Sequence, residues 1–305
     1  MPWTASDIPD QSGRTALITG ANSGLGLETA RELTQKGARV FLACRSLEKA
    51  KAAQATLAAT AQAELIPLAL DLADLNSVRR AIDQVRAKAQ ALDLLINNAG
   101  VMAPPRQLSA QGLELQFAVN HLGHFALTQG LLPLLDQRSG SRVVHVSSGA
   151  AYFGRIAFAD LQGAQRYDAW GAYAQSKLAN LMTAFALQEQ LQRRGSKTQS
   201  LVAHPGLART NLQPTSVAAR GSRLEGLAYR LMDPLFQSAA MGALPQLYAA
   251  TAAEAEPMAF YGPGGAGNLK GYPSRCRIAK QALNTESRER LWQISAELSE
   301  AALVS

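Results

Sequence analysis

A tyrosine and a lysine four residues apart give this sequence its clearest potential for proton transfer. Tyr173 and Lys177 fall in a helical stretch, Ala172–Leu191, so their spacing places both side chains on one helix face. A free phenol has a pKa near ~10 and exchanges protons poorly at neutral pH. A nearby ammonium favours the phenolate and lowers that pKa. The pair therefore predicts a tyrosine that acts as a general acid or base, although this spacing is also common in ordinary helices.

A glycine-rich segment, TGANSGLG at 19–26, is the second feature that could do chemistry. It follows an apolar run at Thr15–Thr19 and precedes a helical pattern at Leu25–Lys36. Glycines permit a tight turn, and the backbone N–H groups that begin a helix can bind a pyrophosphate. Turns also need glycine, so the position between a strand and a helix is what indicates a nucleotide site.

The elements that would position these residues can be predicted, because strand patterns alternate with helical patterns from the start of the chain. The expected strands are Thr15–Thr19, Arg39–Cys44, Glu64–Leu70, Leu92–Asn97, Arg142–Ser147 and Gln199–His204. The expected helices include Leu25–Lys36, Leu47–Thr60 and Leu75–Ala89, and a last helix that Asn284 and Thr285 can cap and that ends near Leu303. The alternation predicts the α/β class, with a Rossmann-type doubly wound parallel sheet in the order 3-2-1-4-5-6-7 and helices on both faces. Pro67 fits this order, because the third strand is then an edge strand, where proline is tolerated.

No linker or repeat divides the chain, so residues 1–305 are expected to form one domain. Two regions lie outside the regular alternation: a substrate-binding insertion at about 207–235 and a C-terminal extension at about 255–305. Thr210–Asp233, within the insertion, could be a mobile lid or an ordinary surface insertion. Tyr261–Gly267, within the extension, is predicted as a turn-rich loop.

Composition and charge exclude several classes of protein. Hydrophobic residues make up 47% of the chain, too many for a disordered protein. The net charge is +7, but the basic residues are spread out and aromatic residues total only 6%, so a solvated basic surface is expected rather than a nucleic-acid partner. Two distant cysteines, Cys44 and Cys276, make no disulfide framework and predict a reducing, cytoplasmic location.

No membrane partner is expected either. The stretches Leu115–Leu135 and Pro234–Ala253 lack charged residues, but both contain polar residues and are predicted as buried or interfacial helices. The N-terminus shows no basic start followed by an apolar stretch, so no secretory signal is predicted.

Five motifs, in order along the chain, resemble those of a known family. They are TGANSGLG at 19–26, Asn97–Gly100, the Ser147-Ser148 pair, YxxxK at 173–177, and Pro205–Thr210. With them, residues 10–275 resemble the short-chain dehydrogenase/reductase family. The segments ACRSLEKA, VNHLGHF and YAQSKLAN are most similar to the branch of retinol dehydrogenases, WW-domain oxidoreductase and light-dependent protochlorophyllide reductase. The resemblance implies hydride transfer between a nicotinamide cofactor and a carbonyl or alcohol.

The resemblance also implies roles for single residues. Tyr173 would exchange the proton, and Lys177 would lower the pKa of Tyr173 and hold the nicotinamide ribose. Ser148, rather than its neighbour Ser147, would polarise the substrate oxygen. Asn120 would kink its helix and anchor a water in the proton relay. The implied cofactor contacts are Gly20, Asn22, Ser23, Gly24, Leu25, Gly26, Arg45, Asp71, Leu72, Asn98, Ala99, Gly100, Tyr173, Lys177, Pro205, Gly206 and Thr210.

Arg45 bears on the choice of nicotinamide cofactor. An acidic residue beyond the second strand is typical of NAD sites, whereas an arginine accommodates the 2′-phosphate of NADP. No carboxylate appears here before Glu48, so NADP(H) is preferred and NAD(H) remains an alternative. Arg45 could also be an ordinary solvated loop residue. Asp71, which the resemblance places at the adenine, could equally cap the helix that follows it.

Two further constellations suggest other chemistry. His121 and His124 could form a metal pair, but no third ligand is nearby and a structural role is favoured. Ser148 with His145 or His204 could suggest a serine hydrolase, but no G-x-S-x-G elbow surrounds any serine.

The sequence thus predicts an NADP(H)-dependent oxidoreductase that interconverts an apolar carbonyl and its alcohol. Two alternatives stay open: an NADP(H)-binding sensor without turnover, and a protochlorophyllide-type reductase. A homodimer or homotetramer is expected, formed through the helices at about Gly112–Leu135 and Ala172–Gln192.

Overall fold

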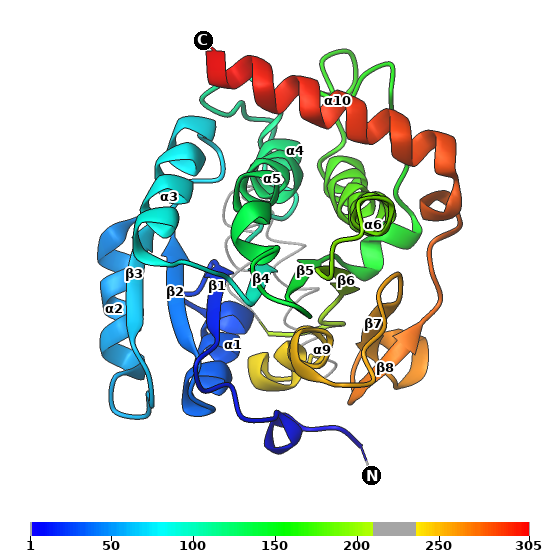
Figure 1. Ribbon diagram of the computed structural model, residues 1–305. Helices are drawn as coiled ribbons and strands as arrows, with labels where there is room; N and C mark the ends of the chain where they lie inside the picture. Colours follow the sequence, from blue (N-terminus) through cyan, green and yellow to red (C-terminus); the bar gives the residue numbers. More distant parts are fainter. Residues whose placement is uncertain (1, 210–235, 305) are drawn as a thin grey trace.

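An eight-stranded sheet crosses the molecule in the order β3-β2-β1-β4-β5-β6-β7-β8 (Figure 1). This computed structural model describes residues 2–209 and 236–304. The strands are β1 (Thr15–Thr19), β2 (Arg39–Cys44), β3 (Leu65–Ala69), β4 (Leu94–Asn97), β5 (Arg142–Val146), β6 (Gln199–Ala203), β7 (Phe260–Pro263) and β8 (Pro273–Cys276). Neighbouring strands are parallel except that β8 runs antiparallel to β7. The predicted single α/β domain and its strand order are confirmed, with β8 added at the edge.

Helices cover both faces of the sheet (Figure 1). On one face lie α1 (Gly24–Gln35), α2 (Leu47–Leu57) and α9 (Ala239–Thr251). On the other face lie α3 (Leu75–Lys88), α5 (Gly123–Leu135) and α6 (Ala169–Arg193). The short α4 (Leu115–Phe117) and a π-helical turn (Ala118–Leu122) lead into α5, and α10 (Thr285–Val304) crosses outside α5 and α6.

The central strands are buried on both faces, which explains their nearly continuous apolar sequence. Ile18 and Leu42 join the core beneath α1 and α2, whereas Leu17 and Phe41 join the core beneath α3 and α5. Pro67 of β3 pairs in register with Leu42 of β2, and β3 is an edge strand, as the sequence predicts.

The predicted turn-rich loop at Tyr261–Gly267 is wrong in its first half. Phe260–Pro263 forms β7, which is buried and pairs with β6. Gly262 marks a close approach there rather than a turn, because a Cβ on it would lie 2.1 Å from Nε2 of His204. The turn itself begins at Gly264, whose N–H donates to the carbonyl of Tyr272.

The structure also changes the expected route to an oligomer. Every residue of α6 from Tyr173 to Gln188 is buried within the single chain, so this part of α6 offers no free face to a partner. The helix α10 covers part of α6, and its Arg288 contacts Glu189 there. It also covers α5, where Trp292 packs edge-on against Phe125. The use of α6 as a subunit interface is therefore corrected.

The two uncharged stretches are buried helices of the fold. The first comprises α4, the π-turn and α5, and the second contains α9. Across residues 2–209 and 236–304, no helix has the length and apolar character needed to cross a membrane. Thr210 and the candidate lid at Thr210–Asp233 lie outside the described residues.

Candidate functional site

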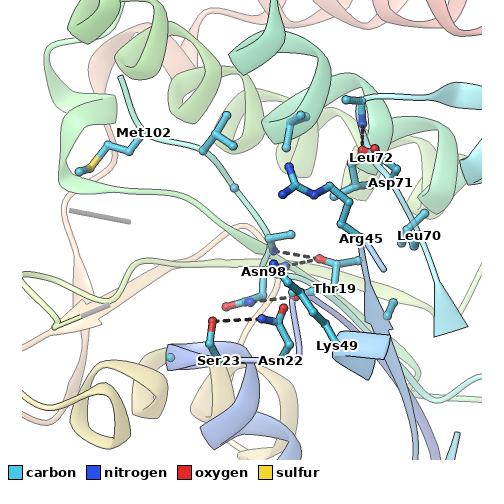
Figure 2. A pocket seen from close by; sticks show the side chains of 18 of the residues that line it. Thr19, Asn22, Ser23, Arg45, Lys49, Leu70, Asp71, Leu72, Asn98 and Met102 are labelled. Carbon is cyan, nitrogen blue, oxygen red and sulfur yellow. Dashed lines mark hydrogen bonds between the residues drawn. The ribbon is translucent and has the colours of Figure 1, made fainter. Parts of the chain in front are cut away.

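A cleft of about 490 Å³ opens at the carboxyl ends of β1, β2, β3 and β4 (Figure 2). Open parallel sheets gather their ligands at this edge, where the strand order reverses. Most of the predicted cofactor contacts line it: Gly20, Asn22, Ser23, Gly24, Leu25, Arg45, Asp71, Leu72, Asn98, Ala99 and Gly100. The structure therefore brings residues from four strand ends into one cavity.

The glycine loop shapes one wall of the cleft. Gly20 and Gly24 have φ values of +68° and +53°, a conformation that favours glycine. Gly26 does not line the cleft, and its role is packing, because a Cβ there would lie 2.3 Å from the carbonyl oxygen of Gly20. Ser23 begins α1 without a capping hydrogen bond, and the first turn of α1 holds no acidic residue. The positive end of the α1 dipole is thus uncompensated and suited to a phosphate.

Arg45 and Lys49 place two cations on the cleft, among the lining residues shown in Figure 2. Arg45 follows β2, and Lys49 lies in the first turn of α2. Among the described residues, neither side chain forms an ion pair with a carboxylate. Sequence reasoning missed Lys49, because no local pattern separates it from Lys51 on the same helix, and only the fold brings it to the cleft.

Asp71 lines the cleft and does not cap α3. Its carboxylate accepts from the N–H of Ala73 at 2.9 Å. Asp74 is the cap, accepting from the N–H of Asn76 at 3.0 Å. The alternative that Asp71 caps the helix is therefore wrong, and its carboxylate stays at the cleft.

Tyr173 and Lys177 lie on one face of α6, as their spacing predicts. The Nζ of Lys177 is 5.9 Å from the centroid of the Tyr173 ring, and only 7% and 4% of the two residues are exposed. The Nζ donates to the carbonyl of Val146 at 3.1 Å, and burial lowers the pKa of Lys177 to about 8. A Cβ on Gly100 would lie 3.3 Å from this Nζ, so the lysine stands at the Gly100 end of the cleft.

The two adjacent serines differ in what they contact. Ser147 is buried and donates to the carbonyl of Lys177 at 2.7 Å, so its hydroxyl is used by the fold. Ser148 is only half-buried and accepts from the N–H of Ala150 at 3.2 Å, which leaves its proton for another acceptor. The geometry favours Ser148 for a substrate contact.

Asn120 sits in the middle of the π-turn, and its side chain is fully engaged. The amide oxygen accepts from the N–H of Val101 at 2.8 Å. The amide nitrogen donates to the carbonyl of Val101 and to the hydroxyl of Ser176, each at 2.9 Å. Asn120 thus ties the segment after β4 to the helix that bears Tyr173.

Two residues of the last sequence motif, Pro205 and Gly206, were predicted to contact the cofactor and are described by the structure. Neither of them lines the cleft. Gly206 has φ +64°, and a Cβ on it would lie 2.3 Å from the carbonyl oxygen of Leu269. Glycine is therefore needed here because the backbone at Leu269 passes close to it.

Comparison with known proteins settles the family. Residues 14–221 match the model of the family described as short chain dehydrogenase. The chain belongs to the short-chain dehydrogenase/reductase family. It is 40% identical to retinol dehydrogenase 12 of Mus musculus over 287 residues, which cover 94% of this chain and 86% of that protein. It is 36% identical to retinol dehydrogenase 14 of Homo sapiens, covering 93% of this chain and 85% of the relative.

Solved structures agree with this assignment to the short-chain dehydrogenase/reductase family. An uncharacterized protein from Mycobacterium paratuberculosis is 40% identical, with a TM-score of 0.81 over 98% of both chains. The RhlG/NADP active-site complex from Pseudomonas aeruginosa is 25% identical, with a TM-score of 0.64 over 82% of this chain and 94% of that one. The protein is accordingly a dehydrogenase/reductase enzyme.

In this short-chain dehydrogenase/reductase the two helix histidines are structural. The hydroxyl of Thr19 accepts from the N–H groups of Asn98 and Ala99, and its proton points at Nε2 of His124, 2.8 Å away, rather than at the more distant carbonyl of Ile96 at 3.4 Å. Nδ1 of His124 then donates to the carbonyl of Asn120 at 3.0 Å. His121 instead contacts Ser295, and no group of three potential metal ligands occurs among the described residues.

The buried amine of Lys177 predicts how stability depends on pH. Its pKa is lowered from 10.5 to about 8 because burial disfavours the ammonium. Between these two values the unfolded chain holds a proton that the folded protein has lost, so the free energy of unfolding rises with pH across this window. The measurement is the free energy of unfolding of the unliganded wild-type protein and of Lys177→Met, from denaturant titrations at several pH values. We expect the wild-type value minus the variant value to rise between neutral pH and about pH 10. A difference that stays level would contradict the lowered pKa.

Proposed function

We propose that the protein is an NADP(H)-dependent oxidoreductase that interconverts an aldehyde or ketone with its alcohol. The observation that carries this proposal is the Lys177 amine beside Gly100, a residue that lines a cleft suited to a dinucleotide, with the Tyr173 ring 5.9 Å from that amine. The uncompensated start of α1 and the two cations Arg45 and Lys49 are suited to its phosphates. When bound, the cofactor would supply or accept the hydride.

The side chains around Tyr173 provide the rest of the chemistry. Tyr173 gives a proton to the oxygen as a carbonyl is reduced and takes it back in alcohol oxidation. The ammonium of Lys177, held by the carbonyl of Val146, favours the phenolate of Tyr173. Ser148 donates to the substrate oxygen as negative charge develops on it. Asn120 supports this set by fixing the segment at Val101 against α6.

An apolar substrate fits the surface next to Tyr173. Trp170 packs edge-on against the Tyr173 ring at 6.0 Å between centroids and is 40% exposed. Phe153 is 86% exposed, and its neighbour Gly154 packs against the backbone of Ala174. Exposed aromatic side chains beside a reactive group favour a bulky apolar ligand. The names of the retinol dehydrogenase relatives agree with such a substrate.

The preference for NADP(H) over NAD(H) rests on the cations at the cleft. A 2′-phosphate would neutralise the charges of Arg45 and Lys49. An NAD site would instead need a carboxylate that accepts from the free ribose hydroxyl, and the first carboxylate after β2 is Glu48, which does not line the cleft. The structural relative RhlG was solved as a complex with NADP.

Removing the charge of Lys49 should weaken NADPH binding selectively. We expect Lys49→Gln to raise the Kd of NADPH about fivefold at low salt and to leave the Kd of NADH within about twofold. Fluorescence titration at two salt concentrations measures both. The matched control is Lys51→Gln, because Lys51 is exposed on the same helix and does not line the cleft. Equal effects of the two variants would show that only general surface charge is at work.

Turnover tests the proposal against its alternatives. The purified protein is mixed with NADPH and a panel of apolar aldehydes, ketones and quinones, and cofactor oxidation is followed by absorbance. Consumption of NADPH with formation of the alcohol supports the proposal. Tight NADPH binding without turnover on any member would instead favour a sensor, and light-dependent activity on a porphyrin would favour a protochlorophyllide-type reductase. The substrate-binding role of residues 207–235, a cytoplasmic location and a homo-oligomer stay predictions.

A further inference from the structure

The C-terminal helix α10 reaches the layer of helices that bears the site. Its Trp292 packs on Phe125 with 4.8 Å between ring centroids, and its fully buried Leu291 joins the core that contains Leu178 and Phe185 of α6. Between these contacts, Ser295 of α10 lies 2.7 Å from His121 of the π-turn, and both residues are buried. This is a polar contact inside an otherwise apolar interface, where an unpaired group would be costly.

The direction of this hydrogen bond follows from the other bonds of Ser295. Its hydroxyl has one proton, which it donates to the carbonyl of Leu291 at 2.7 Å. The lone pairs of that hydroxyl face Nε2 of His121, which donates to Ser295 in the tautomer that carries its hydrogen on Nε2. Burial lowers the pKa of His121 to about 3, so the ring is neutral and holds a single N–H at neutral pH. Besides Ser295, the ring makes a hydrogen bond with the side chain of Asn180 on α6.

His121 adjoins Asn120, and the two side chains anchor the π-turn in different places. Asn120 binds Val101 and Ser176, and the hydroxyl of Ser176 donates to the carbonyl of Tyr173 at 2.8 Å. His121 binds α10. The turn is closed by the N–H of Gly123, which donates to the carbonyl of Ala118. An isolated π-turn is an unusual register within an α-helix and needs such side-chain support.

We propose that His121 is a positioning residue: its hydrogen bond to Ser295 lets α10 hold the π-turn in the register that presents Asn120 to Val101 and Ser176. The consequence for catalysis rests on the proposed function, because it concerns the turn of α6 that bears Tyr173 and Lys177. Of this network only Val101 lines the cleft, and none of its members is Arg45 or belongs to the glycine loop.

Four variants of the full chain separate the hydrogen bond from packing. Ser295→Ala removes the acceptor, and His121→Phe removes the donor but keeps a ring between Phe117 and Phe125. His121→Gln keeps a donor of similar reach and loses the ring. The control is Ser299→Ala, because the Ser299 hydroxyl lies one turn further along α10 and donates only to the carbonyl of Ala296 among the bonds of the described residues.

Two measurements decide the proposal. The first is hydrogen exchange at the amide of Gly123, which needs no turnover: we expect exchange about tenfold faster in Ser295→Ala and His121→Phe, and unchanged in Ser299→Ala. The second is kcat, calculated per NADPH-binding site. The concentration of binding sites is measured by titration, so that unfolded molecules are not counted. We expect this kcat to fall about tenfold in Ser295→Ala and His121→Phe, with the Kd of NADPH unchanged, and to fall far less in His121→Gln.

The outcomes are distinguishable. Unchanged exchange at Gly123 in Ser295→Ala overturns the proposal whether or not the enzyme turns over a substrate. Faster exchange with an unchanged kcat per site shows that α10 supports the fold alone, and this also overturns it. A double variant, Ser295→Ala with His121→Phe, should be no slower than His121→Phe alone, because the bond that Ser295→Ala removes is already absent there. Failure of the wild-type protein on the whole carbonyl panel would count against the proposed function and would leave the exchange test standing.

Discussion

Replacing Tyr173 with phenylalanine is expected to lower kcat about a thousandfold, because the variant lacks the proton that the substrate oxygen needs. The ring itself remains, with its edge-on contact to Trp170 and its distance of 5.9 Å from the Lys177 amine. The Kd of NADPH should therefore stay within about twofold, since the cleft that holds the nucleotide is untouched. Stopped-flow reduction of an aldehyde from the panel measures kcat, and fluorescence titration measures the Kd.

A second tyrosine serves as the control for this prediction. Tyr248 lies on α9, where it packs against Trp3 and Tyr261, away from the cleft. Tyr248→Phe should keep the kcat of the wild-type protein. If Tyr173→Phe retained more than about a tenth of that kcat, another group would have to deliver the proton, and the assignment of Tyr173 would fail.

The scaffold of the cleft follows from local sequence patterns. Strands such as Leu94–Asn97 are apolar and short, and the glycine loop has its meaning only because it joins β1 to α1. Pro67 even identifies the edge strand, because a proline cannot donate to a neighbouring strand. These features depend on residues close together in sequence, so one chain suffices to predict them.

The errors share a different cause, which is contact between distant segments. Gly262 looks like a turn residue, yet its lack of a side chain makes room for His204, which lies far away in sequence. Asp71 and Asp74 both precede α3, and only the structure shows which of the two carboxylates caps it. The helix at Ala172–Gln192 was expected to face a second subunit because of the family resemblance, but α10 of the same chain lies against it. Low charge indicates burial without indicating what covers the helix.

The same limit applies within the site. YxxxK spacing places Tyr173 and Lys177 on one helix face, but the sequence does not distinguish Ser147 from Ser148. The distinction appears only once the hydroxyl of Ser147 is seen to donate to the carbonyl of Lys177. Lys49 likewise becomes a candidate phosphate contact only when the fold brings it to the cleft beside Arg45.

Arg45→Asp should reverse the preference for the cofactor. Arg45 follows β2 at the place where dinucleotide sites recognise either a ribose hydroxyl or a 2′-phosphate. The variant replaces an attractive, charge-assisted contact with a carboxylate that repels the phosphate dianion and can accept from both ribose hydroxyls. We expect the Kd of NADPH to rise about a hundredfold and the Kd of NADH to fall severalfold.

The positive charge of Lys49 predicts how the remaining NADPH binding of Arg45→Asp depends on salt. Lys49 still lines the cleft in the variant, so residual NADPH binding should weaken further with added salt, whereas NADH binding should depend on salt only slightly. Arg39→Asp is the control, because Arg39 is a β2 arginine that pairs with Glu64 and does not line the cleft. Titration of both cofactors against both variants gives the four constants required. If Arg45→Asp kept its preference for NADPH, Arg45 would not be the group that recognises the 2′-phosphate, and its assigned role would fail.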